Sequence, residues 1–157
     1  MQSLSVVQER RAASVWTKIH PIFAIAQLLV FVVSLVLLAL YALHVVPFHA
    51  VHVSVLVKIV LMLGAIVTGA LWERDVFGWW WFAPDYFVED ATTVLVVILH
   101  VAYLVLVYTW PANMQAIVAM LCAAYTVYAV NVGHYVIRNR QMRAFAKRNA
   151  EAGELAA

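Results

Sequence analysis

The sequence WERDVFGWWWFAPDYFVED, residues 72–90, separates two long apolar segments and concentrates the acidic and aromatic residues of the chain. Of the 8 acidic residues in the sequence, this stretch holds Glu73, Asp75, Asp85, Glu89 and Asp90. It also contains a run of three tryptophans and further aromatic residues. Tryptophan and tyrosine collect where hydrocarbon meets water, so the stretch is predicted to lie along a membrane surface. Carboxyl groups in such half-dry surroundings are candidates for acid–base chemistry.

The composition of the whole chain indicates an integral membrane protein. The 157 residues are 66% hydrophobic and only 11% charged, whereas a soluble domain carries about a quarter charged residues. The net charge of +2 comes from basic ends and not from a basic surface, which excludes nucleic acid as a partner and leaves the lipid bilayer.

Four segments reach the length of about 20 apolar residues that a spanning helix needs, at roughly 19–45, 52–72, 88–110 and 112–137. Pro47 ends the first of them, and Pro111 is expected in the first turn of the fourth. An acidic and aromatic loop, 73–87, and a polar, helical tail, 138–157, remain outside the spans. The sequence therefore predicts an all-α integral membrane protein with one domain, a four-transmembrane-helix bundle.

The basic residues outside the predicted spans all fall on one side of the membrane. They are Arg10, Arg11, Lys18, Arg74, Arg138, Arg140, Arg143, Lys147 and Arg148. Positive residues stay cytoplasmic, so both termini and the acidic loop are predicted to face the cytoplasm.

Polar residues inside the spans recur on single helix faces, which predicts that they point into the bundle. The first span carries His20, Gln27, Ser34 and Tyr41 at seven-residue intervals. The second carries Lys58, and then Gly64, Thr68 and Gly69, which permit close helix approach. The third carries Glu89, Thr93, His100 and Tyr103, and the fourth ends with Tyr128, Asn131 and His134.

Depth along the helices predicts two groups of neighbours. Lys58 and His100 reach similar depth in the membrane at about 1.5 Å of rise per residue. A second group should converge at the cytoplasmic rim under the aromatic loop, namely His20, Glu73, Glu89, Asp90, Asn131 and His134.

Each of these residues also has a structural interpretation. Lys58 could only satisfy a carbonyl of a neighbouring helix, and His100 could make a structural hydrogen bond. Glu73 could be a solvated charge, while Glu89 and Asp90 could simply complement the dipole of a helix. The tryptophans could form an interfacial belt.

Two other functional classes stay open on these grounds. A small membrane cytochrome with b-type haem needs histidine pairs at matched depth, and only His20 with His134 qualifies. A small assembly subunit of a pigment complex is the other alternative. A transporter would be expected to show repeats or broken helices at mid-membrane, and neither is evident.

Several motifs resemble one known family. They are WTKIHPIFAIAQLLVFVVSLVL at the first span, GALWERDVFG with FAPDYFVED around the loop, LHVAYLV in the third span and AAYTVYAVNVGHYV in the fourth. Together they resemble the 2-vinyl bacteriochlorophyllide hydratases, also called chlorophyllide a hydratases, over roughly residues 15–137. The chain differs in having His134 where a glutamine is expected, in bulkier residues at 79–81 and in the outer loop at 47–52.

The resemblance implies a hydro-lyase that adds water to the ring-A vinyl group of chlorophyllide a or its bacteriochlorophyllide counterpart. The product carries a 1-hydroxyethyl group and leads toward bacteriochlorophyll. No cofactor and no metal site are implied, since magnesium enters only as part of the substrate. A multi-pass location in a bacterial inner membrane and contact with other enzymes of bacteriochlorophyll synthesis are also expected.

Roles for the predicted rim residues follow from the resemblance. Glu89 is the expected proton donor, and Asp90 or Glu73 the group that orients water. The residues expected to hold the substrate are Asn131, His134 and His100, and one way for His134 to do so is through the magnesium of the substrate. Aromatic faces for stacking are expected from Trp80, Phe82 and Tyr86.

Overall fold

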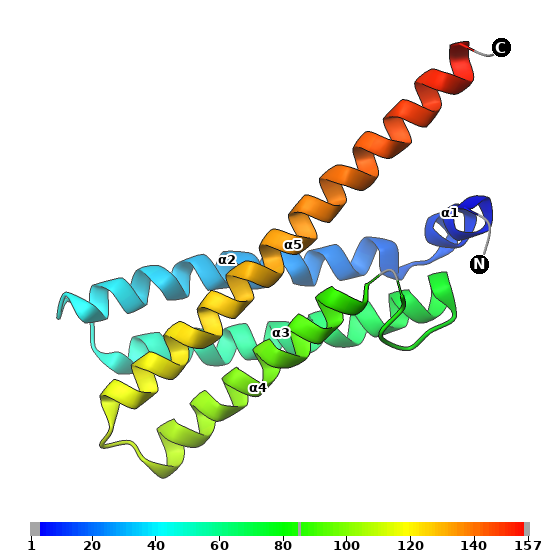
Figure 1. Ribbon diagram of the computed structural model, residues 1–157. Helices are drawn as coiled ribbons and strands as arrows, with labels where there is room; N and C mark the ends of the chain where they lie inside the picture. Colours follow the sequence, from blue (N-terminus) through cyan, green and yellow to red (C-terminus); the bar gives the residue numbers. More distant parts are fainter. Residues whose placement is uncertain (1–3, 85, 156–157) are drawn as a thin grey trace. The chain divides into compact units, whose positions relative to one another are not determined.

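The computed structural model describes residues 4–84 and 86–155, so that Asp85 of the acidic stretch lies outside the described residues. The elements are the helices α1 (Leu4–Ala13), α2 (Trp16–Ala42), α3 (Phe48–Phe77), α4 (Phe87–Thr109) and α5 (Met114–Leu155) (Figure 1). Four stretches in this part of the chain are long and apolar enough to cross a membrane, at Trp16–Ala42, Phe48–Phe77, Phe87–Thr109 and Met114–Arg138. The prediction of an all-helical protein with four spanning helices is therefore confirmed.

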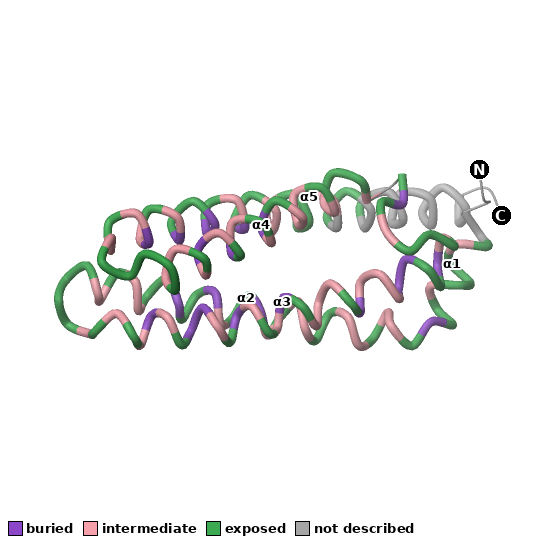
Figure 2. The backbone as a smooth tube through the Cα atoms, turned by 90° about the horizontal axis from the view of Figure 1, so that it is seen from below, coloured by how far each residue is buried: buried purple, intermediate pink, exposed green. Residues whose placement is uncertain are grey.

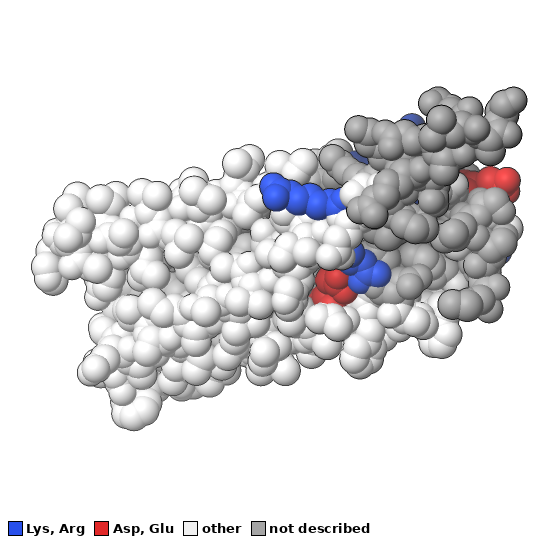
Figure 3. Space-filling view, turned by 45° about the horizontal axis from the view of Figure 1, so that its top comes forward, with Lys and Arg blue, Asp and Glu red and all other residues white. Residues whose placement is uncertain are grey.

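The chain divides into two compact units, Met1–Ala83 and Pro84–Ala157. Each unit is a helical hairpin, α2 with α3 in the first and α4 with α5 in the second. In the first unit, buried positions recur along both α2 and α3 among exposed ones (Figure 2). Much of the surface seen in Figure 3 is uncharged, as expected for helices that face lipid.

The contact between α2 and α3 follows the polar face that the sequence predicted for the first span. Gln27 and Ser34 are buried, and the Ser34 hydroxyl lies 2.6 Å from that of Ser54 on α3. The Nδ1 atom of His20 lies 3.1 Å from the hydroxyl of Thr68. These hydroxyl and imidazole contacts join the two helices where lipid offers no hydrogen-bond partner.

Two glycines of α3 allow the close approach expected of them. A Cβ added at Gly64 would lie 2.5 Å from Cδ1 of Phe23 on α2 and closer still to Cε1. At Gly69 an added Cβ would lie 3.3 Å from the His20 ring. Side chains of α2 therefore occupy the space beside both glycines.

Hydrogen bonds tie the start of α2 and the end of α3 together at one end of the first unit. The Ser14 hydroxyl donates to Oδ2 of Asp75 at 2.9 Å. The indole N–H of Trp72 donates to the Thr17 hydroxyl at 3.0 Å. Helix α1, which the sequence analysis did not predict, packs against this end of α3.

The third helix is longer than predicted. The expected span stopped at residue 72, with a loop from 73, but α3 continues through Phe77 and Glu73 is helical. Neither glycine nor proline interrupts residues 73–77, and Gly78 then ends the helix with φ of +80° in the left-handed region. The acidic loop is therefore only the short segment between Gly78 and Tyr86.

The start of the last span also differs from its prediction. Pro111 was expected in the first helical turn, yet it lies in the connection before α5. The Asn113 side chain accepts a hydrogen bond from the Ala116 amide at 3.1 Å and caps the helix there. From Met114, α5 runs unbroken to Leu155, well past the apolar segment.

Candidate functional site

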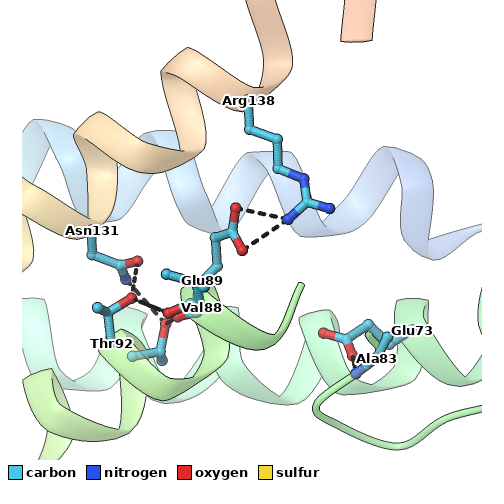
Figure 4. A network of polar contacts seen from close by, with 8 residues as sticks. Glu73, Ala83, Val88, Glu89, Thr92, Asn131 and Arg138 are labelled. Atoms are coloured by element: carbon cyan, nitrogen blue, oxygen red, sulfur yellow. Dashed lines mark hydrogen bonds and ion pairs between the residues drawn. The ribbon is translucent and has the colours of Figure 1, made fainter. Parts of the chain in front are cut away.

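Glu89 and Arg138 form an ion pair at one end of the second unit. Glu89 lies in the first turn of α4, and Arg138 lies on α5 at the end of its apolar segment. One guanidinium nitrogen, Nη1, donates to both carboxylate oxygens of Glu89 at 2.9 Å (Figure 4). The Glu89 side chain is only 12% exposed and that of Arg138 27%, so the pair is half-shielded from water. The pair holds the carboxylate in a fixed orientation.

Tyr86 is a second neighbour of the same arginine. The carbon at the centre of the Arg138 guanidinium lies 4.1 Å from the centre of the Tyr86 ring, in cation–π contact. Tyr86 is the N-cap residue of α4. Arg138 therefore links the start of α4 to α5 through an aromatic face and a carboxylate.

Asn131 on α5 also joins α4, at residues one helical turn after Glu89. Its amide oxygen accepts a hydrogen bond from the Thr92 hydroxyl at 2.8 Å, and its amide nitrogen donates to the Thr93 hydroxyl at 3.0 Å (Figure 4). The Thr93 hydroxyl in turn donates to the carbonyl of Glu89 at 2.8 Å, and the Thr92 hydroxyl lies 3.0 Å from the same carbonyl. Asn131 thus supports the turn of α4 that carries Glu89.

In the first unit, Glu73 holds the loop that follows α3. Its Oε2 atom accepts a hydrogen bond from the Ala83 amide at 3.2 Å (Figure 4). The residue is only 5% exposed and Ala83 is fully buried. Glu73 is therefore not the solvated loop charge of the structural interpretation.

The segment between these anchors presents aromatic rings. Trp79 and Trp80 are more than half exposed, and Phe82 is 38% exposed. The guanidinium of Arg74 lies 4.2 Å from the centre of the Trp80 ring. Trp81 and Phe82 meet edge to face, with ring centres 5.9 Å apart. The aromatic stretch is thus an ordered surface with a cation at one of its rings.

The remaining predicted residues lie in different settings. His134 is exposed on α5, and Asp90 is half-buried in the first turn of α4. His100 is buried in mid-span, where its Nδ1 atom lies 2.8 Å from the Val96 carbonyl of its own helix. Its ring is 6.2 Å from that of Tyr125 on α5. These contacts favour the packing interpretation of His100.

The structure brings together some of the predicted residues within each unit. Glu89, Asn131 and Tyr86 share one end of the α4–α5 hairpin through Arg138 and the threonines. Glu73, Trp80 and Phe82 share the end of α3 and its loop. The convergence of Glu73 with Glu89, and of Lys58 with His100, joins residues of different units and stays a prediction.

Sequence reasoning missed Arg138 and Arg74 as members of the site and used both only as markers of orientation. A signal for Arg138 was present, because it follows Asn131 by seven residues and so occupies the same helix face. For Arg74 no comparable signal existed, since its stacking on Trp80 depends on the turn at Gly78. In the part of the chain that the structure describes, no three His, Cys, Asp or Glu residues gather as a metal site would require.

Fold and site together define a multi-pass helical membrane protein with carboxyl, guanidinium and aromatic groups held at helix ends. The family model for 2-vinyl bacteriochlorophyllide hydratase matches residues 6–141 of the sequence. The chain belongs to this family.

Two curated relatives carry the same name. The protein of Rhodobacter capsulatus is 41% identical over 147 residues, which cover 93% of this chain and 84% of the relative. The protein of Cereibacter sphaeroides is 39% identical over 135 residues, covering 85% of this chain and 83% of the relative. No solved structure matches the chain. The relatives favour the hydratase over the cytochrome and the assembly subunit.

Proposed function

We propose that this protein is a hydro-lyase that adds water across the ring-A vinyl group of a chlorophyllide-type tetrapyrrole. The substrate is chlorophyllide a or 2-vinyl bacteriochlorophyllide, and the product carries a 1-hydroxyethyl group on the path to bacteriochlorophyll. The observation that carries the proposal is the family match over residues 6–141. The carboxylate fixed at the end of the α4–α5 hairpin supplies a group suited to this chemistry.

The reaction consists of two proton transfers around a short-lived cation. A proton is added to the terminal carbon of the vinyl group, and the cation that forms next to the macrocycle is stabilised by conjugation. The oxygen of a water molecule then bonds to the inner vinyl carbon, which carries the positive charge, and a base takes one of the protons of that water. The net change is the addition of one water, so neither an oxidant nor a reductant is needed. The proposal accordingly includes no cofactor, with magnesium present only in the substrate.

The contacts of Glu89 suit the second proton transfer better than the first. Arg138 pairs with the charged carboxylate and orients both of its oxygens. Each oxygen keeps a further lone pair with which to accept a proton from water. We therefore assign Glu89 to the water, in place of the proton-donor role that the sequence suggested. Proton delivery falls to Glu73 or Asp90, the other carboxyl groups of the predicted set.

The substrate-binding part of the proposal rests on exposed and amphiphilic side chains. Trp80, Phe82 and Tyr86 offer ring faces on which a flat macrocycle can stack. His134 is exposed on α5, where its imidazole is accessible to the magnesium of a bound pigment. Asn131, half-buried on α5, completes the proposed set, and His100, buried in mid-span of α4, supports it only by packing within the hairpin.

The proposed setting is a bacterial inner membrane. The proposed arrangement is a four-transmembrane-helix bundle with both termini and the aromatic loop on the cytoplasmic side. Other enzymes of bacteriochlorophyll synthesis are proposed partners there. Cysteine-labelling from either side of sealed vesicles tests the orientation: reagents restricted to the cytoplasmic side should modify cysteines introduced at residue 9 or 79. Modification only from the other side would overturn it.

The test of the function is hydration of added chlorophyllide a by pigment-free purified protein, followed by chromatography of the pigment. Glu89→Gln should abolish the hydroxyethyl product, because it removes the base and its pairing with Arg138. Glu9→Gln, at an exposed position of α1, is the matched control and should be fully active. Absence of product with the unmodified protein would refute the function. Normal product from Glu89→Gln would remove only Glu89 from its role.

A further inference from the structure

We propose that Arg74 and Trp80 form a subsite that binds the free propionate carboxylate of the substrate, so that the enzyme selects the free acid over its ester. The inference rests on the proposed function, because it names what the first unit recognises in the same pigment. A chlorophyllide carries this carboxylate free, whereas the corresponding chlorophyll carries it esterified to a long alcohol. Selection between them therefore needs one well-placed cation beside a flat apolar surface.

The backbone around this subsite is fixed at two points. The Gly78 amide donates to the Arg74 carbonyl at 3.0 Å and turns the chain back at the end of α3. The Ala83 amide donates to the buried carboxyl group of Glu73. Between the two anchors, Phe82 takes a φ of +56°, which is uncommon for an aromatic residue. Unusual backbone of this kind persists where the surrounding contacts require it, and it is frequent at ligand sites.

The side chains on this backbone combine an apolar face with a positive charge. Trp80 is 57% exposed, and the Arg74 guanidinium stacks at 4.2 Å from the centre of its ring. A stacked guanidinium keeps its N–H groups directed outward in its own plane, where they suit a carboxylate. Within residues 4–84 and 86–155 no carboxylate forms an ion pair with Arg74. The proposal assigns this charge to a ligand.

Charge and shape both favour this ligand over a lipid. A pigment that is flat, apolar and singly charged at one edge matches an indole ring that carries a guanidinium over one of its faces. The neighbouring exposed ring of Trp79 extends the same apolar surface. If the tryptophans only anchored the protein at the membrane surface, the charge at Arg74 would have no influence on which pigment is hydrated.

The test compares two substrates and two variants. KM is measured for chlorophyllide a and for its methyl ester, which differ only in the charge of the propionate. Arg74→Gln should raise KM for the free acid by about fivefold, the size of a half-exposed charge pair, and leave KM for the ester unchanged. Arg74→Lys, which keeps the charge and loses the planar fork, should lie in between. Lys18→Gln, an exposed basic residue of α2, is the matched control and should change neither KM.

The outcomes separate this inference from the proposed function. If the unmodified protein hydrates neither pigment, the function itself fails. If it hydrates both with the same KM, or if Arg74→Gln raises both values equally, the subsite is refuted while the function stands. Should Arg74→Gln be unstable, the comparison of Trp80→Phe with Trp80→Leu on the same two substrates replaces it. The subsite is supported if Trp80→Leu loses the preference for the free acid while Trp80→Phe keeps it. It is overturned if both variants keep an unchanged preference.

Discussion

Replacing Gly64 by alanine should weaken the contact between α2 and α3 more than the same replacement at Gly69, Gly78 or Gly133. The new Cβ would lie 2.5 Å from Cδ1 of the Phe23 ring. Ordinary contact between such carbons is about 3.5–4.0 Å, so the ring must move by roughly 1 Å or the helices must separate. Gly64 lies in the middle of α3, where the helix backbone cannot shift locally to make room.

The size of the effect follows from two opposed terms. Inserting a methyl group into a packed interface costs about 1–3 kcal/mol. Alanine is a better helix former than glycine by about 1 kcal/mol, which offsets part of that cost. The net loss should be about 0–2 kcal/mol, corresponding to a fall in Tm of up to about 8 °C for a chain of this size.

Gly133 on α5 provides the matched control, because an added Cβ would meet no atom within 4 Å. Gly133→Ala should keep or raise Tm, since only the helix-forming term acts. Both variants are compared with the unmodified protein by thermal unfolding in one detergent. Adding Phe23→Leu to Gly64→Ala should recover much of the loss by removing the ring. Equal Tm for the two alanine variants, or no recovery in the double variant, would refute the close approach of α2 and α3.

Three further substitutions test the polar contacts. Arg138→Gln should lower kcat for hydration about tenfold or more, because it releases the general base Glu89. Arg138→Lys should retain part of the activity. An unchanged kcat in both variants would refute the role of Arg138 in positioning Glu89. Lys58→Met should leave kcat and KM for the hydratase reaction unchanged. It should not lower Tm either, because a fully buried lysine carries a desolvation cost. A loss of hydratase activity without a loss of Tm would give Lys58 a functional role. Asn131→Leu should lower Tm by a few degrees, since each of the two interhelical hydrogen bonds of Asn131 contributes about 0.6 kcal/mol. A rise in KM at unchanged Tm would instead support substrate binding by Asn131.

Hydropathy and periodicity were sufficient to predict the four membrane-spanning helices and the face that α2 turns to α3, but not helix α1. A spanning helix must satisfy its own backbone hydrogen bonds, so its length and apolar content are visible in the sequence. The interval of seven residues placed Gln27 and Ser34 correctly at the contact with α3. The end of α3 was placed too early because charged residues were taken as the start of a loop. Helices in fact continue through charges and stop at a residue such as Gly78.

The contacts of the site were harder to predict, because each depends on a turn or on a second helix. The pairing of Glu89 with Arg138 requires the part of α5 around residue 138 to lie beside the first turn of α4. The bond from Ala83 to Glu73 requires the chain to reverse at Gly78. Sequence patterns report on one helix at a time, so they identified the carboxyl groups and missed the partners that orient them.

The reaction itself explains why the helix ends and not the buried polar residues carry the candidate chemistry. Hydration consumes water, which the middle of a bilayer does not supply, while the pigment is apolar enough to partition into the membrane. Lys58 and His100 are fully shielded within their spans and therefore have no ready access to water. Glu89 lies in the first turn of α4 and is shielded only in part, so that water can reach it, and the proposed reaction requires the pigment to reach it there as well. A site for this reaction has to lie at such a boundary, and the aromatic stretch with which the sequence began has the composition of one.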